Sequence, residues 1–315
     1  MKNIIFFLLI SPFISHCQEY VDVLKLGYSY SNKAKFKGID ESTSIKSYNA
    51  SITFPIELSS KYAFLTGIDF SSNNLLLSPN YNQSTTLYNT LLKIGLATTY
   101  SEKWSSTFVL LPKIASDYHN ISGNDFNFGV YAIAKLKKNK NFKYRFGFYA
   151  STEAFGIFAT PIIGAYYLSP NNRFEIDASL PIAANVNYKF EKSAIGFDYF
   201  GIGRSYNISQ ETTIPVYVDQ RPIEISSYFQ YKTLKENILL RAKVGYSNNT
   251  YEVYEQGDSL DFRISAFSFG DNRTELNLAI LGSVFFKLEV ICKIHFLINT
   301  FLDFIISLPI PTEVP

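Results

Sequence analysis

The sequence predicts an all-β fold, a transmembrane antiparallel up-and-down β-barrel of about 12–14 strands. Three observations predict it: apolar and polar residues alternate at period two, the alternating segments are about ten residues long, and short connections alternate with long ones. Of the 315 residues, 47% are hydrophobic and only 18% are charged. The mean hydropathy is close to zero. This balance is too apolar for a water-covered surface and too polar for membrane helices.

Period-two alternation is typical of strands, in which successive side chains point to opposite faces. Leu24, Leu26 and Tyr28, for example, alternate with Lys25 and Gly27. The alternating segments are 23–30, 47–56, 92–98, 126–136, 143–148, 182–190, 195–199, 229–231 and 238–246. A tilted strand of about 9–11 residues is long enough to cross a membrane. A soluble β-sandwich also alternates, but the strand length and the many Tyr and Phe residues favour the barrel.

The connections between these segments alternate in length, as in barrels with short periplasmic turns and long outer loops. Short turns are expected at 59–61, 101–103, 137–141, 169–172, 191–193 and 234–237, and longer loops at 31–44, 71–86, 115–125, 205–221 and 247–260. The segment 174–190 keeps one phase through Pro181. Proline cannot donate inside a closed ladder and single-chain bacterial barrels have even strand counts, so we expect a tight outer turn near Leu180–Ala183.

The chain divides into a signal peptide at 1–17, the barrel at 18–296 and an atypical apolar tail at 297–315. Lys2 and the apolar run that follows it are typical of a secretory signal, with cleavage after Cys17. Lipidation of Cys17 is the alternative, and His16 disfavours it because a lipoprotein site has a small residue there. Cys292 is interpreted as a small buried or lipid-facing hydrophobe.

The last alternating segment, 286–296, ends on Phe296, as the closing strands of outer-membrane barrels end on an aromatic that the barrel assembly machinery reads. The tail beyond Phe296 departs from this pattern. It is either a short interfacial helix or a translation-frame accident, and the sequence does not decide between them. If 286–296 is the closing strand, removing the tail should preserve or improve assembly.

Motifs for catalysis, cofactors and metals are weak, so we expect no catalytic, cofactor-binding or metal-binding residues. A formal net charge of +2 gives no field for nucleic acid, and two cysteines exclude a cysteine-rich zinc site. His119 is interpreted as a solvated loop residue and His295 as a residue of the lumen or its rim. The glycines of 201–204 fit a bend at a strand end. An acidic loop could supply calcium ligands, although solvated turns are the commoner reading of such a cluster: Asp117, Asn120, Asn124 and Asp125.

Charged residues on the polar face of the strands would point into the lumen, since each would cost about 2–4 kcal/mol on the lipid face at the midplane. The expected inward cations are Lys25, Lys93, Lys135, Lys143, Arg145, Lys189, Lys232, Arg241, Lys243, Lys287 and Lys293. The expected inward acids are fewer: Asp69, Glu175, Asp177, Asp198, Glu224 and Glu289. A basic lumen would favour anionic solutes if it is open. Alternatively, these charges pair with one another inside a plugged or narrow barrel.

Several short motifs resemble a known family. They are VLKLGYSY at 23–30, YLSPNNRF at 167–174, Leu180-Pro181, VNYKF at 186–190 and LDFRISAFSFGD at 260–271. Together they are similar to an uncharacterised outer-membrane β-barrel family of Bacteroidetes, known only as a domain of unknown function, over roughly residues 18–296. The resemblance implies the fold and a location in the cell outer membrane of a Gram-negative bacterium, but no activity, ligand or catalytic residue.

The sequence therefore predicts a non-enzymatic pore or small-solute transport barrel with a somewhat basic lumen and an unknown solute. A closed structural or surface-binding barrel that acts through its outer loops is the first alternative. A barrel-embedded hydrolase is the second. The expected partners are outer-membrane lipid and lipopolysaccharide and the barrel assembly machinery, with no nucleic acid.

Overall fold

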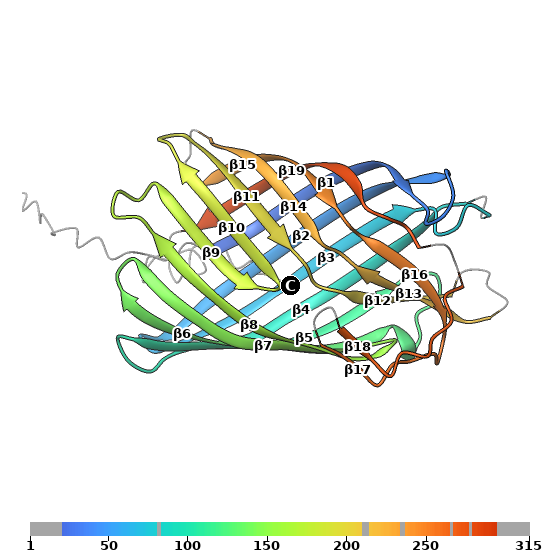
Figure 1. The fold of residues 1–315 in the computed structure, drawn as a ribbon. Helices are drawn as coiled ribbons and strands as arrows, with labels where there is room; N and C mark the ends of the chain where they lie inside the picture. The colour runs from blue at the N-terminus through green and yellow to red at the C-terminus, as the bar shows by residue number, and fades with distance from the viewer. Residues whose placement is uncertain are drawn as a thin grey trace, which may run out of the picture.

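A computed structural model describes residues 21–80, 83–209, 214–233, 237–264, 267–276 and 279–294. Within these residues, fourteen antiparallel strands form a closed barrel (Figure 1). Strands β1 and β19 close it, with Tyr28 opposite Leu288. The wall strands are β1 (Val21–Lys35), β2 (Ser42–Ser59), β3 (Tyr62–Leu75), β4 (Thr85–Thr99), β5 (Trp104–Ser116), β6 (Phe126–Asn139), β7 (Phe142–Glu153), β8 (Gly156–Leu168), β9 (Phe174–Leu180), β10 (Ala183–Lys189), β11 (Ser193–Phe200), β14 (Glu224–Lys232), β15 (Ile238–Ser247) and β19 (Ser283–Ile294).

The predicted fold class and strand number are confirmed. The barrel has a turn end, where β1 begins and β19 stops, and a loop end, where the long connections lie. The expected tight turn separates β9 from β10 at residues 181–182, with a cis peptide bond between Leu180 and Pro181. Phe296, the residues of the expected signal peptide and the apolar tail all lie outside the described residues.

Alternation gives the wall an apolar outer face and a polar inner face. Large apolar residues of one phase are exposed, such as Leu26, Phe148 and Phe197. Residues of the other phase contact side chains across the interior. Ser71 on β3, for example, accepts a hydrogen bond from Arg204, which lies in the long connection after β11. The inner phase is therefore identified by contacts that only an interior position allows.

Strand lengths differ from the expected ten residues. Strands β1–β8 have 12 to 18 residues, whereas β9 and β10 have 7 each. The predicted loops at 31–44 and 71–86 are consequently too long, because pairing continues to Lys35 and Leu75 before each connection begins. These segments are polar because they are the ends of strands that extend beyond the apolar outer face of the wall.

The two late connections contain strands, so the prediction of plain loops at 205–221 and 247–260 was wrong. Part of each connection returns to the barrel interior, where buried side chains such as Tyr206 and Tyr251 pack against the wall. The inserted strands are β12 (Arg204–Ile208), β13 (Val216–Arg221), β16 (Thr250–Glu255), β17 (Phe262–Ile264) and β18 (Phe267–Phe269). Strand β13 pairs with both β12 and β16, which makes a three-stranded inserted sheet. The one helical turn among the described residues is η1 (Gly123–Asp125).

Candidate functional site in the barrel interior

A cluster of charges lies on the inner face of neighbouring wall strands, and Glu289 on β19 is at its centre. The side chain of Glu289 has 0% exposure, and its carboxylate oxygens lie 3.4 Å from Nζ of Lys25, 3.2 Å from Nζ of Lys243 and 3.4 Å from Nζ of Lys287. Arg241 approaches the same carboxylate at 3.7 Å. Residues two positions apart on a strand point to the same face. The pairing of β15 with β19 places Arg241 opposite Glu289 and Lys243 opposite Lys287, which brings these charges together.

A second carboxylate, Asp198 on β11, completes this lumen charge cluster. It forms an ion pair with Lys243, lies 4.0 Å from Arg241 and accepts a hydrogen bond from Ser226. Arg241 also donates to Gln230 and stacks over the ring of Tyr228, 4.2 Å from its centroid. We define the lumen charge cluster as Lys25, Asp198, Arg241, Lys243, Lys287 and Glu289. It contains four cations and two acids.

The acids of this cluster are less accessible than its most exposed cation. Lys25 keeps 38% of its side chain exposed, whereas Asp198 keeps 19% and Glu289 none. The carboxylate oxygens of Glu289 have no hydrogen-bond partner. The other three cations keep 7–18% of their side chains exposed, so Lys25 alone is more accessible from the open interior than Asp198.

The remaining sequence-predicted cations are distributed around the wall, most of them in pairs. Lys93 contacts Asp69 at 2.6 Å, Lys189 contacts Glu175 at 2.8 Å and Lys293 contacts Asp22 at 3.5 Å. Arg145 pairs with Asp177. Lys143 lies 5.6 Å from the ring centroid of Tyr166. Lys135 stands opposite Arg145, and Lys232 opposite Leu239, in the strand register. The structure thus joins four of the predicted cations in one cluster and places the others apart.

The loop end of the interior is filled by the inserted sheet. One face of this sheet, which includes Tyr206, Val218 and Tyr251, packs against buried residues of the wall strands β1–β5. These wall residues are small or aliphatic, such as Leu75 and Leu87, both with no exposed area. The other face, with Tyr217 and Tyr254, packs toward β6–β8. Figure 1 shows β12, β13 and β16 at the end of the barrel beyond the short strands β9 and β10.

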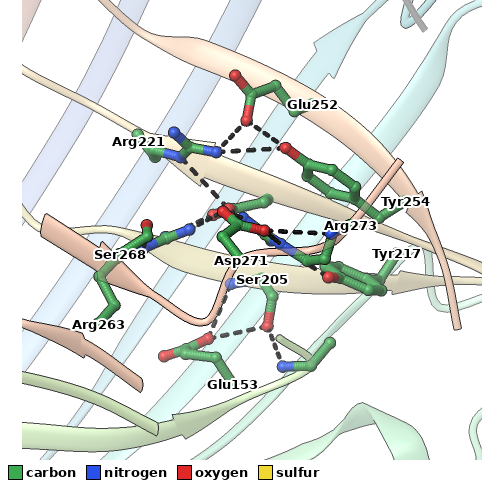
Figure 2. A network of polar contacts seen from close by, with 12 residues as sticks. Glu153, Ser205, Tyr217, Arg221, Glu252, Tyr254, Arg263, Ser268, Asp271 and Arg273 are labelled. Carbon is green, nitrogen blue, oxygen red and sulfur yellow. Dashed lines mark hydrogen bonds and ion pairs between the residues drawn. The ribbon is translucent and has the colours of Figure 1, made fainter. Parts of the chain in front are cut away.

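Asp219 on β13 is the centre of a polar network at this end. Figure 2 labels the three arginines of this network, Arg221, Arg263 and Arg273. Arg263 donates to both carboxylate oxygens, at 3.0 and 2.6 Å. Arg273 and Arg221 donate to the same carboxylate at 3.2 and 3.3 Å. Asp219, Arg263 and Arg273 are almost completely buried. The network links β13 to β17 and to the segment that follows β18.

Further acids balance the charge of this arginine network. Arg221 pairs with Glu252, whose carboxylate also accepts a hydrogen bond from Tyr254 (Figure 2). Arg273 donates to Asp271 at 2.8 and 2.9 Å. Three arginines therefore meet three carboxylates.

Asp219 has a shifted pKa because its surroundings favour the charged form. Burial alone would raise the pKa of this carboxyl, but the hydrogen bonds and positive charges of Arg263, Arg221 and Arg273 outweigh burial and lower its pKa. The Arg273 hydrogen bonds likewise lower the pKa of Asp271. Both carboxylates are therefore ionised at neutral pH and hold the arginines in place.

A second buried pair anchors β12 to the wall. Lys113 on β5 pairs with Glu153 at the end of β7, and both side chains are almost inaccessible. The other oxygen of Glu153 accepts hydrogen bonds from the backbone N–H of Ser205 at 2.8 Å and from its hydroxyl at 3.0 Å (Figure 2). The inserted sheet is thus held by polar contacts as well as by apolar packing.

Of the loop residues considered as calcium ligands, Asp117 and Asp125 are hydrogen-bonded to β12 and to Ser209, which follows it. Asp117 accepts hydrogen bonds from Ser209, and Asp125 accepts one from Asn207 at 2.7 Å. Asp125 is completely buried, which differs from the solvated turn that the sequence suggested. His119 is exposed, as expected of a loop residue. In the described part of the chain, no group of three or more His, Cys, Asp or Glu side chains is arranged to hold a metal ion.

Sequence reasoning missed the interior network of the inserted segments. Asp219 stands in a stretch that was interpreted as an outer loop, and its partners Arg263 and Arg273 lie 44 and 54 positions later in the sequence. The available signal was the run of β-branched and aromatic residues at 216–218, which favours a strand. Such a run does not identify the partners of the strand. Among the described residues, no helix combines the length and the apolar character needed to span a membrane.

Comparisons with known proteins give a family and several structures of similar fold. No curated protein matches the chain. The porin NanC has 9% sequence identity and a TM-score of 0.38, over 86% of this chain and 100% of that one. A mutant of the monoaromatic hydrocarbon channel TodX has 11% identity and a TM-score of 0.36, over 87% and 89%. OprB of Pseudomonas putida has 10% identity and a TM-score of 0.35, over 87% and 94%. The domain of unknown function DUF6268 matches residues 14–251, most of the chain, and the protein belongs to this family.

Proposed function

We propose that this protein is a non-enzymatic outer-membrane barrel that passes small anionic solutes, and that its described conformation is closed at the loop end. The lumen charge cluster is the observation that carries the proposal. Four cations share two carboxylates, and the central carboxylate, Glu289, is buried. A surplus of positive charge in a confined, low-dielectric interior attracts anions.

The apolar outer face supports a membrane location. Exposed apolar side chains occur on successive wall strands, for example Phe108, Phe146, Ile195, Phe229 and Leu288. A continuous apolar belt of this kind would be unstable in water. Lipid and lipopolysaccharide are the contacts that such a belt requires, and the barrel assembly machinery is the partner expected for insertion.

The proposal includes the source organism, the signal peptide and the C-terminal tail. A Gram-negative source among the Bacteroidetes follows from the family resemblance. The signal peptide at 1–17 and the tail after Phe296 stay predictions, because these residues lie outside the part of the chain that the structure describes. Fractionation of cells that express the full chain tests the location. The mature protein should sediment with the outer membrane and resist extraction by salt, and recovery in the soluble periplasm would contradict the proposal.

Dry packing at the loop end favours a second candidate, a closed barrel that acts through its surface. The apolar face of the inserted sheet leaves no exposed area on wall residues such as Leu75 and Ala115. A permanently open channel would require a wet path there. The two candidates therefore differ in one respect. The channel requires the inserted sheet to move out of the loop end, whereas the closed barrel keeps it there permanently.

Planar-bilayer recording separates these candidates. The gated-channel proposal predicts brief openings of the purified full chain and a reversal potential that shows anion preference. It also predicts longer openings when the anchor of the inserted sheet is weakened by Asp219→Asn. Absence of any opening in both proteins would favour the closed barrel, and cation preference would contradict the anionic solute.

A further inference from the structure

The barrel wall has a step between β8 and β9. Strand β8 has 13 residues, but β9 pairs only with its turn-end part, from Ile163 to Leu168. The loop-end residues Ile157–Ala159 of β8 pair with β7 on one side but would lack a partner on the side of β9. They pair instead with β17, in parallel, with Phe262 opposite Ile157. An inserted strand thus continues the wall above the short hairpin of β9 and β10.

The hairpin of β17 and β18 has two different faces. Its inward residue is Arg263, which is 2% exposed, binds Asp219 and lies 4.0 Å from the ring centroid of Phe155. Its outward residues are apolar and exposed: Phe262, Ile264, Phe267 and Phe269. Phe267 is 71% exposed. We call these four residues the hairpin patch.

The hairpin patch is continuous with the apolar belt of the wall. Phe262 stands beside Ile157, which is exposed on the outer phase of β8. The rings of Phe262 and Phe269 stack with a centroid separation of 4.6 Å. A membrane-crossing strand needs about 9–11 residues. Leu168 is at the turn end of β8, and Ile157 lies about one such membrane-crossing length away from it along the strand. The patch therefore stands at the loop-end border of the belt, where aromatic girdles occur.

We propose that the hairpin patch is seated in lipid, so that β17 and β18 form a panel of the membrane-facing wall rather than an aqueous outer loop. The proposed partner is the acyl-chain region of the surrounding leaflet. The inference rests on the proposed membrane location. Continuity with the belt argues for lipid as the occupant, because the patch extends an outward apolar phase without a break.

Tryptophan fluorescence tests this placement, since the sequence contains a single tryptophan, Trp104. Trp104 begins β5 at the turn end and is exposed on the outer phase. The double variant Trp104→Phe/Phe267→Trp moves the indole to the patch. It would be refolded into phosphatidylcholine vesicles with brominated acyl chains, which quench fluorophores in lipid, and titrated separately with aqueous iodide. The matched control is Trp104→Phe/Ile121→Trp, because Ile121 is exposed in the connection between β5 and β6.

The proposal predicts that brominated lipid quenches the indole at position 267 at least as strongly as it quenches Trp104, and that iodide quenches it less than the indole at position 121. Quenching at 267 by iodide alone would show an aqueous loop and overturn the proposal. Protection from both quenchers would show a second copy of the chain on the patch, which also overturns it. Failure of brominated lipid to quench wild-type Trp104 would instead contradict the membrane location itself. Compact migration of unheated samples in gels shows whether each variant has folded.

Discussion

At the scale of single residues, two buried carboxylates have contrasting surroundings. Asp219 accepts hydrogen bonds from Arg263 at 2.6 and 3.0 Å, as a structural anchor would. Glu289 has cations at 3.2 to 3.7 Å and no hydrogen-bond partner. A fully satisfied network specifies one conformation. We therefore interpret Asp219 as an anchor of the inserted sheet, and Glu289 as the centre of a charge cluster whose cations outnumber its acids.

Asp219→Asn should loosen the inserted sheet. The amide keeps the size of the side chain but removes the charge, so three buried or half-buried guanidinium groups lose their common partner. Breaking a buried ion pair costs about 3–5 kcal/mol. Limited proteolysis should then cut the connection 201–223 faster while the barrel stays folded. The control is Asp40→Asn, since Asp40 forms only an exposed pair with Lys35. An equal cleavage rate in both variants would contradict the anchoring role.

Acid should have the same effect on the wild type. Asp219 is on β13, outside the fourteen wall strands, and its pKa is lowered in the folded state. A carboxyl with a lowered folded-state pKa stabilises the fold above its unfolded pKa of about 3.9, and this contribution is lost as pH falls below that value. Protease cleavage at 201–223, measured with an acid-active protease from pH 6 to pH 3, should accelerate below about pH 4. The acceleration should be much smaller in Asp219→Asn, and an unchanged pH profile there would exclude Asp219 as its cause.

At the scale of elements, the sequence predicted the wall better than the inserted segments. Period-two alternation located wall strands such as β1 and β7, because each has one face on lipid-like surroundings and one on a polar interior. Strands β13 and β16, by contrast, lie in segments that were interpreted as outer loops. Strand order and the side that a loop folds toward depend on long-range contacts, such as that of Tyr206 with Asn73, which local patterns do not contain.

The close approach of the β9 backbone makes Gly164 on β8 a sensitive position. A Cβ at Gly164 would lie 2.0 Å from the carbonyl oxygen of Ala178 on β9, and backbone cannot move away as a side chain can. Gly164→Ala should therefore weaken the β8–β9 pairing, by roughly 1–3 kcal/mol as in overpacked sites. Urea titration of the refolded barrel measures this loss. Gly123→Ala is the control, since nothing lies within 4 Å of a Cβ there, and a similar midpoint for both variants would contradict the close approach.

At the scale of the whole molecule, the interior has two parts with different chemistry. The loop end is a dry, layered core in which three arginines are matched by three carboxylates. Farther toward the turn end, the lumen charge cluster has two cations more than it has acids. The near-neutral net charge of the chain conceals this division. Only the position of each charge, and not the sum over the sequence, determines what an ion in the interior would meet.

Removing this surplus should remove anion preference without disturbing the fold. Lys25 and Lys287 each lie 3.4 Å from the same oxygen of Glu289, so the double variant Lys25→Gln/Lys287→Gln leaves two cations for two acids. Reversal potentials in a salt gradient should shift from anion preference toward none. Lys46→Gln is the control, because Lys46 is exposed on the opposite phase of β2 and should leave the potential unchanged. An undiminished anion preference in the double variant would show that this cluster does not set selectivity.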